Sequence, residues 1–362
     1  MDALGLVTHD EGHARIGRPR RVAPLALLLA LGCGGDRVEL PAPAPAAPGE
    51  PPPYALASDD RRFLEDLARQ LVRGRNGRER PATTERLDFT LKVVAGGPGT
   101  GRPAAELEAW VFEAWTEVRG GRAPSAADTV LLLHGLGDSK ASMAGLARRL
   151  QSRGMRAVAV DLRGHGRSEG DHIAYGAFEA PDLSQVLDAL AARGLVLGKV
   201  GVYAASYGAH IAAQLAARDG RVDRVVAVGA YRSLRATVPD FVALRYPERR
   251  DVPEPAVQDA VTAAGRLAGF DPEDASAERW LAAPEAGPGQ VLFVHGADDE
   301  VVPIAHAERM AEVCGGPCRL LRLEGKDHLG SMHGPTLRAA LLAWLEGRWD
   351  EVPSGAAESD AG

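Results

Sequence analysis

The chain has 362 residues, enough for one large domain or two smaller ones, and its 45% hydrophobic and 25% charged residues are typical of globular proteins. The formal net charge of -7 is dispersed along the sequence without a basic stripe, which argues against nucleic-acid binding. The three cysteines are Cys33, Cys314 and Cys318.

The first 32 residues are predicted to be an export signal with a long leader rather than part of the fold. Arginines at 15, 18, 20 and 21 precede an apolar run over residues 22–32, which is too short to span a bilayer. The run ends in Ala30-Leu31-Gly32-Cys33, which resembles the bacterial lipobox, where the signal is cut before the cysteine and the thiol carries lipid. This resemblance implies a lipid anchor on Cys33 and an exported protein, bound to a membrane of a bacterial cell envelope. A plain secretory signal, or a buried free cysteine, is the alternative.

Residues 33–58 are rich in proline and alanine and are predicted to form an extended tether. A tether favours the anchor interpretation, because a lipidated cysteine needs a spacer to hold a folded domain off the membrane. Residues 59–350 are expected to fold as one domain, followed by a disordered tail over residues 351–362.

The folded region begins with a predicted helix over Asp59–Arg73, in which apolar residues recur at helical spacing opposite a charged face. Two segments that alternate apolar and polar residues follow, Arg86–Ala95 and Glu106–Val118, with a Gly/Pro-rich turn between them. They are predicted to be an antiparallel pair of strands.

From Thr129 the pattern changes to continuous apolar strands that alternate with amphipathic helices, which is typical of a mostly parallel sheet covered on both faces. The predicted strands are Val130–His134, Ala157–Asp161, Lys199–Ala205, Arg224–Val228, Gln290–His295 and Arg319–Leu323. The predicted helices are Ser142–Arg153, Ala180–Arg193, Tyr207–Arg218, Ile304–Val313 and Pro335–Gly347. The rhythm breaks over residues 231–289, an insert of mixed character that is interpreted as a lid.

Cys314 and Cys318 are separated by only Gly315, Gly316 and Pro317. In an exported protein, so close a pair across a turn predicts a disulfide. A metal site would need further ligands, which are not found nearby, so neither a metal nor another cofactor is expected.

The stretch Gly201–Ala209 runs from a predicted buried strand through Ser206 into an Ala-rich helix. Ala204 and Gly208 flank the serine like the small residues of a G-x-S-x-G nucleophile elbow, with alanine in place of the first glycine. Small residues there let strand and helix pack closely, so that the turn lifts the hydroxyl above the sheet. By itself the pattern also fits a serine that caps a helix.

A serine hydroxyl becomes reactive at neutral pH when an imidazole takes its proton and a carboxylate orients that imidazole. The strand Gln290–His295 runs into a loop with Asp299, and the strand Arg319–Leu323 runs into a loop with His328. Because sites form at the carboxyl ends of parallel strands, these side chains are expected to meet Ser206. Their chain order is Ser, Asp, His, which differs from the trypsin-like and subtilisin-like orders.

Five motifs together resemble the α/β-hydrolase family over roughly Leu87 to Gly347. They are His134–Gly137, Asp161–Ser168, Ala204–Gly208, His295–Pro303 and Gly325–His328. The Arg-Gly-His-Gly-x-Ser turn in the second motif is most similar to the branch of monoacylglycerol lipases and serine-aminopeptidase-like hydrolases. The resemblance implies an α/β-hydrolase fold, a mostly parallel sheet with helices on both faces and a short lid insert.

The resemblance also implies a role for each member of a catalytic triad: Ser206 as nucleophile, His328 as general base and Asp299 as the acid that orients it. Asp299 is chosen over Asp298 because the family's acid stands three residues after the glycine of the His-Gly pair. His333 lies farther from the strand end than His328 and is interpreted as a surface or lid-facing residue.

The backbone N–H groups of Tyr207 and Leu136 are the predicted oxyanion hole, since acyl transfer needs preorganised donors. Tyr207 follows the nucleophile at a helix N-terminus, and Leu136 follows His134-Gly135 in a loop whose conformation the glycines permit. The remaining polar residues at strand ends and turns, His134, His165, Asp161 and His295, are interpreted as structural.

The sequence therefore predicts a serine hydrolase that cleaves carboxylic esters through an acyl-enzyme, with a small-molecule or lipid ester as substrate. A peptidase or amidase that uses the same triad is one alternative. A catalytically silent lipoprotein that uses the fold as a binding module is another, although a silent copy is expected to have lost a member of the triad.

Overall fold

The computed structural model describes residues 38–42, 54–76, 87–118, 121–124, 128–196, 199–283, 287, 289–314 and 318–352. Residues Gly35–Gly362 form one compact unit, to which all the described residues belong. The predicted export signal, Cys33, the middle of the tether and most of the C-terminal tail lie outside the described residues.

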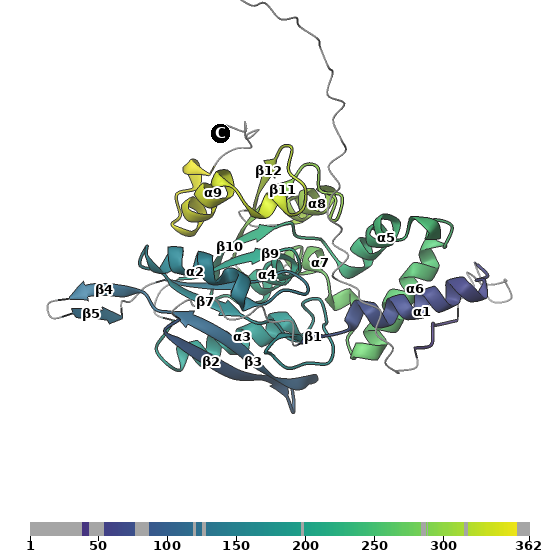
Figure 1. The fold of residues 1–362 in the computed structure, drawn as a ribbon, viewed down its shortest axis with the longest axis horizontal. Helices are drawn as coiled ribbons and strands as arrows, with labels where there is room; N and C mark the ends of the chain where they lie inside the picture. The colour runs from purple at the N-terminus through teal and green to yellow at the C-terminus, as the bar shows by residue number, and fades with distance from the viewer. Residues whose placement is uncertain are drawn as a thin grey trace, which may run out of the picture. The chain divides into compact units, whose positions relative to one another are not determined.

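A sheet whose order is β12-β11-β10-β9-β6-β7-β3-β2 forms the centre of this unit (Figure 1). The strands from β12 to β7 in this order pair in parallel, whereas β3 is antiparallel to both β7 and β2. The strands of this sheet are β2 (Phe89–Gly97), β3 (Arg102–Phe112), β6 (Thr129–Leu133), β7 (Arg156–Val160), β9 (Val200–Ala205), β10 (Val222–Val228), β11 (Gln290–Gly296) and β12 (Arg319–Leu323).

Helices cover both faces of the sheet, because alternate residues of each strand point to opposite sides. On one face, Val130 and Leu132 share a core with α2 (Ala144–Gln151) and α9 (Pro335–Leu345). On the other face, Leu131 and Leu133 share a core with three helices. They are α3 (Glu179–Ala191), α4 (Tyr207–Arg218) and α8 (Ala305–Val313). This confirms the predicted α/β architecture and explains why the central strands are unbroken apolar runs.

The predicted strand over Glu106–Val118 is in fact two strands. β3 pairs with β7 as far as Phe112, and β4 (Trp115–Val118) pairs instead with β5 (Gly121–Pro124) in a separate hairpin. Between them the buried Glu113 carboxylate lies 2.9 Å from Nε of Arg156. A buried ion pair therefore lies at the point where the strand leaves the sheet. The alternation of apolar and polar residues over Glu106–Val118 does not predict this break.

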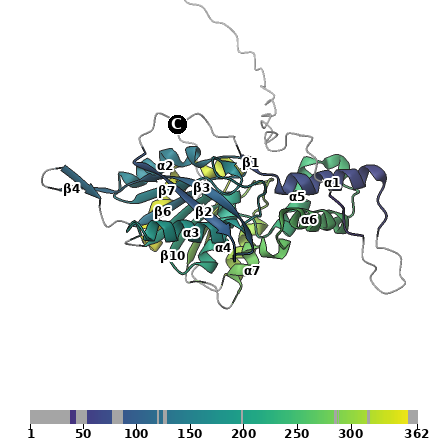
Figure 2. The ribbon, with the colours of Figure 1, turned by 90° about the horizontal axis from the view of Figure 1, so that it is seen from below.

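The insert over residues 231–289 contains α5 (Leu234–Arg245), α6 (Glu254–Ala268) and α7 (Ala277–Leu281). Both views show α5 and α6 beside α1 (Ser58–Val72), away from the sheet (Figures 1 and 2). Arg249 donates to Asp60 of α1 at 2.8 Å, and the ring of Phe63 lies edge-on to that of Tyr246 with centroids 5.1 Å apart. A helix from the start of the domain is thus packed against the insert.

The chain after α1 is held by the loops that precede α3. β1 (Arg75–Asn76) pairs in parallel with β8 (His165–Gly166), and the Tyr175 hydroxyl donates to the carbonyl of Leu71 at 2.7 Å. The first half of α1 is therefore held by the insert, and its C-terminal end is held by the loops that precede α3.

The N-terminal arm, residues 38–42, lies against the folded unit. Val38 is only 6% exposed, and Leu40, Tyr54 and Leu56 pack partly buried against the same core. This result differs from the extended tether predicted over residues 33–58, because the parts of it that the structure describes, residues 38–42 and 54–58, belong to the fold. None of the helices in the described residues is long and apolar enough to cross a membrane.

Candidate active site

Ser206 stands between β9 and α4 in a sharp turn. Its φ of 49° is positive, and among the described residues only Tyr175 shares this property without being glycine. The Ser206 N–H donates to the carbonyl of Val228 at 2.8 Å, and its carbonyl accepts from the His210 N–H at 3.1 Å. The side chain is half-buried and meets the geometry expected of a nucleophile elbow.

The side chains of Ser206, His328 and Asp299 lie in one hydrogen-bonded series. His328 Nε2 is 3.0 Å from Ser206 Oγ, and His328 Nδ1 is 2.6 Å from Asp299 Oδ2. His328 as a whole is 5% exposed, so water has little access to compete for these contacts. The structure thus brings together the three residues that the sequence selected.

The Asp299 carboxylate accepts several hydrogen bonds at the end of β11. Its Oδ1 accepts from the backbone N–H groups of Val301 at 2.9 Å and Val302 at 2.8 Å. Burial alone would raise the pKa of Asp299, but hydrogen bonds from His295 and His328 outweigh burial and hold the pKa well below its usual range. Asp299 is therefore ionised at neutral pH and can stabilise a positively charged His328.

The predicted oxyanion donors flank the serine. Tyr207 is the first residue of α4, so its N–H is one of those that a helix leaves without an intrahelical acceptor. Leu136 follows Gly135, where an added Cβ would lie 3.8 Å from Cβ of Ser206. The loop with Leu136 therefore passes close to the nucleophile.

Two buried groups support this loop. Burial lowers the pKa of His134, so its ring is neutral: Nδ1 donates to the Gly135 carbonyl at 2.8 Å and Nε2 accepts from the Leu162 N–H at 3.1 Å. Asp161 accepts from the backbone N–H of Lys140 at 2.7 Å and from its ammonium group at 2.6 Å. Both predicted structural residues thus hold the loop after β6.

Lys140 is a buried residue of this loop that was not predicted from the sequence. Its side chain is fully buried, 3.1 Å from Glu108 as well as 2.6 Å from Asp161, and lies over the ring of Trp110. A lysine is rarely buried unless its charge is paired. The burial of Lys140 could therefore be predicted only by knowing that the carboxylates of Glu108 and Asp161 lie beside it.

The remaining candidate residues lie outside the series formed by Ser206, His328 and Asp299. Asp298 and His333 are exposed, as expected for residues outside the series. His165 is buried, with its ring centroid 5.1 Å from that of His134. His295, predicted to be structural, is buried with Nε2 3.3 Å from Asp299 Oδ2.

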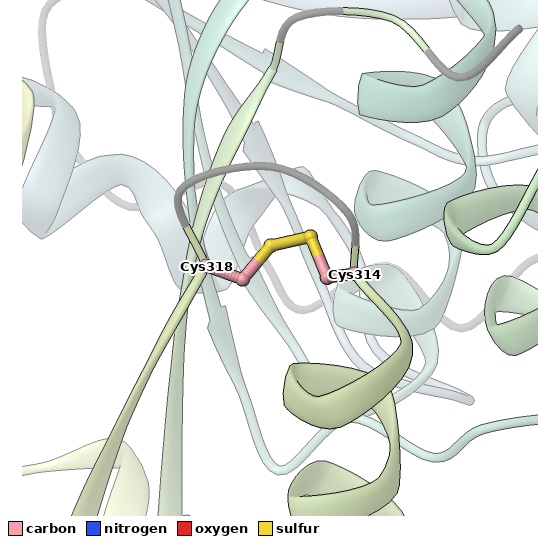
Figure 3. Close-up of a disulfide and its surroundings, with 2 residues drawn as sticks. All are labelled: Cys314 and Cys318. Carbon is pink, nitrogen blue, oxygen red and sulfur yellow. A yellow bond between two sulfur atoms is a disulfide. The ribbon is translucent and has the colours of Figure 1, made fainter. Parts of the chain in front are cut away.

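Cys314 and Cys318 are joined by a disulfide between the end of α8 and the start of β12 (Figure 3). Their Cα atoms are 6.1 Å apart. Among the described residues there is no cluster of His, Cys, Asp or Glu side chains that could hold a metal ion.

Comparisons with known proteins agree with this architecture. An esterase from Pyrococcus furiosus superposes with a TM-score of 0.52 and 16% identity, over 76% of this chain and 96% of that one. A puromycin-hydrolyzing peptidase from Mycobacterium tuberculosis gives 0.52 and 17%, over 76% and 40% of the two chains. The chain has the α/β-hydrolase fold.

Within this fold, sequence comparisons point to a hydrolase. Residues 124–253 of this chain match the family model described as serine aminopeptidase, S33. The uncharacterized protein YqkD of Bacillus subtilis (strain 168) is 26% identical over 205 residues, which are 56% of this chain and 65% of that protein. The match thus spans just under two thirds of the relative's length. Together these findings support a serine hydrolase of the α/β type.

Proposed function

We propose that the protein is a serine hydrolase that cleaves carboxylic esters through an acyl-enzyme on Ser206, with His328 and Asp299 completing the triad. The series from Ser206 Oγ through His328 to Asp299, with contacts of 3.0 and 2.6 Å, carries this proposal. It joins a nucleophile, a base and an orienting acid at the carboxyl ends of parallel strands.

In the first half-reaction, His328 Nε2 takes the proton of Ser206 as Oγ attacks the ester carbonyl carbon. The N–H groups of Tyr207 and Leu136 bind the oxyanion, and the ionised Asp299 stabilises the imidazolium. His328 then gives its proton to the leaving alkoxide, which departs as an alcohol and leaves acyl-Ser206.

In the second half-reaction, water attacks the acyl carbonyl carbon while His328 takes one of its protons. Collapse of the second tetrahedral intermediate breaks the bond to Ser206 Oγ, which recovers its proton from His328. The products are a carboxylic acid and free enzyme.

An ester with an apolar acyl group is the substrate class that we favour. Leu329, directly after the base, is 52% exposed and offers an apolar side chain for such a group to contact. A peptidase is the second candidate, because the family model that matches residues 124–253 is described as a serine aminopeptidase.

The test is labelling by a fluorophosphonate probe, followed by turnover of nitrophenyl esters of rising chain length beside aminoacyl anilides. We expect wild type and the exposed-serine control Ser152→Ala to be labelled and to cleave the esters. Ser206→Ala should lose labelling and at least about 1,000-fold in kcat. An unlabelled wild type would refute the proposal, and turnover of anilides alone would favour the peptidase.

We also propose that Cys33 carries a lipid that binds the protein to a bacterial envelope membrane. The lipobox-like Ala30–Cys33 supports this, and so does the disulfide, because disulfides persist mainly in oxidising compartments. Cells fed a radiolabelled fatty acid should label the wild type but not Cys33→Ser, with Cys314→Ser/Cys318→Ser as the control that stays labelled. Equal labelling of Cys33→Ser would contradict the anchor.

A further inference from the structure

A second imidazole contacts the acid of the triad. His295 is the penultimate residue of β11 and is fully buried. Its Nε2 lies 2.8 Å from the carbonyl oxygen of Val302 and 3.3 Å from Asp299 Oδ2, the oxygen that also binds His328.

The two contacts identify which nitrogen carries the proton. A carbonyl oxygen only accepts, so Nε2 of His295 must be the donor, and its N–H is shared between Val302 and Asp299. Among the described residues, Nδ1 of His295 has no hydrogen-bond partner. Both contacts of the His295 side chain are therefore with the loop after β11 that contains Asp299.

Asp299 consequently receives two donors on each oxygen. Oδ1 accepts from Val301 and Val302, and Oδ2 accepts from His328 at 2.6 Å and from His295 at 3.3 Å. Each additional donor neutralises part of the carboxylate charge and restricts its rotation. His295 and His328 compete for the same oxygen.

We propose that His295 is a positioning residue that holds the Asp299 carboxylate toward His328 and limits the strength with which that carboxylate binds the His328 imidazolium. This inference rests on the proposed function. Without the second donor, Oδ2 would carry more charge for His328 alone. The imidazolium would be more stable, and a higher pH would be needed to obtain the neutral base.

Other titratable and charged residues lie near His295 and Asp299. His306 at the start of α8 lies close enough to His295 for a charge on one ring to disfavour a charge on the other. The same His306 is bonded through Nε2 to Asp240 of α5 at 2.9 Å, and its Nδ1 accepts from the Arg232 N–H at 3.3 Å. These groups are unchanged in variants of His295, so they provide the same background in each comparison.

The experiment measures the rate of fluorophosphonate labelling and kcat/KM for a nitrophenyl ester as functions of pH. Both should rise as His328 loses its proton. In His295→Leu, which lacks the donor, we expect the rising limb to move to higher pH by about half a unit. In His295→Gln, whose amide nitrogen can occupy the place of Nε2, the limb should stay near that of the wild type.

A purely structural role would have a different signature. If His295→Leu melts at a lower temperature but its rising limb coincides with that of the wild type, the inference is wrong. If His295→Leu fails to fold, His295→Asn replaces it, since its shorter amide does not reach Asp299 and should give the same shift.

Nitrogen NMR of histidine in the wild type provides a check without any variant, and a proton on Nδ1 of His295 would overturn the inference.

These outcomes are separable from failure of the proposed function. A wild type that neither reacts with the probe nor cleaves esters would refute the hydrolase itself. A reactive wild type with an unshifted His295→Leu would refute only the role of His295.

Discussion

Ser206 holds a backbone conformation that side-chain-bearing residues rarely adopt. A positive φ of this kind costs on the order of 1–3 kcal/mol and persists only where the surroundings enforce it. Here the N–H and carbonyl of the serine are bonded to Val228 and His210, and α4 starts directly afterwards against β6. The strain therefore depends on the close approach of this helix to the sheet.

Gly208 makes that approach possible. An added Cβ would lie 2.7 Å from the carbonyl oxygen of His134 and 2.8 Å from that of Leu133, both backbone atoms that cannot easily move. We expect Gly208→Ala to push the start of α4 away from β6 and to misplace Ser206 relative to His328. Since a shift of about 1 Å can cost on the order of 100-fold, the rate of fluorophosphonate labelling should fall by about that factor.

Gly220→Ala is the matched control. This glycine is exposed, and no atom would lie within 4 Å of its added Cβ. Its labelling rate should equal that of the wild type. Full labelling of Gly208→Ala would show that the elbow tolerates a wider spacing and that the packing argument fails.

At the scale of elements, α1 and the insert form one packed group despite their separation in the chain. Phe63 of α1 meets Tyr246 edge-on, and the guanidinium of Arg249 lies over the ring of Phe63 with its carbon 5.3 Å from the centroid. The hydroxyl of Tyr54, just before α1, also donates to Asp259 of α6. The insert is thus held from the N-terminal side.

We predict that Phe63→Ala loosens the segment between α5 and α6. The substitution removes the ring that both Tyr246 and Arg249 contact, so local opening should become easier while the central sheet stays folded. Limited trypsin digestion should cut several-fold faster after Arg245, Arg249 and Arg250. Arg62→Ala, on the exposed side of the same helix, should be cut at the wild-type rate. Equal rates for Phe63→Ala and Arg62→Ala would show that α1 does not restrain the insert.

Over the whole molecule, the elements that the sequence predicted best are those whose ends are marked by residues within the element itself. β12 and α4 have the predicted bounds, because an apolar strand and an Ala-rich helix after an elbow carry their own signals. The triad residues could be selected for a related reason: parallel strands bring their carboxyl ends to one edge, so the loops with Ser206, Asp299 and His328 meet.

What the sequence could not predict depends on contacts between distant segments. The helix over Ser58–Val72 was expected, but its packing against the insert depends on single side chains such as Phe63. Lys140 was not predicted for the same reason, since its partner Glu108 stands on another strand. His295 was predicted only as a structural residue, because its position four residues before Asp299 does not show that its side chain contacts the carboxylate. Pairing of this kind leaves no periodicity in either segment.

The burial of Val38 limits how far the folded domain could lie from Cys33 if that cysteine carries the proposed lipid. Four residues separate Cys33 from Val38, and five extended peptide steps span at most about 18 Å. A lipid on Cys33 would therefore keep the buried Val38 within that distance of the bilayer surface. A hydrolase held in this way would stay close to the membrane surface, where esters of membrane lipids are within its reach.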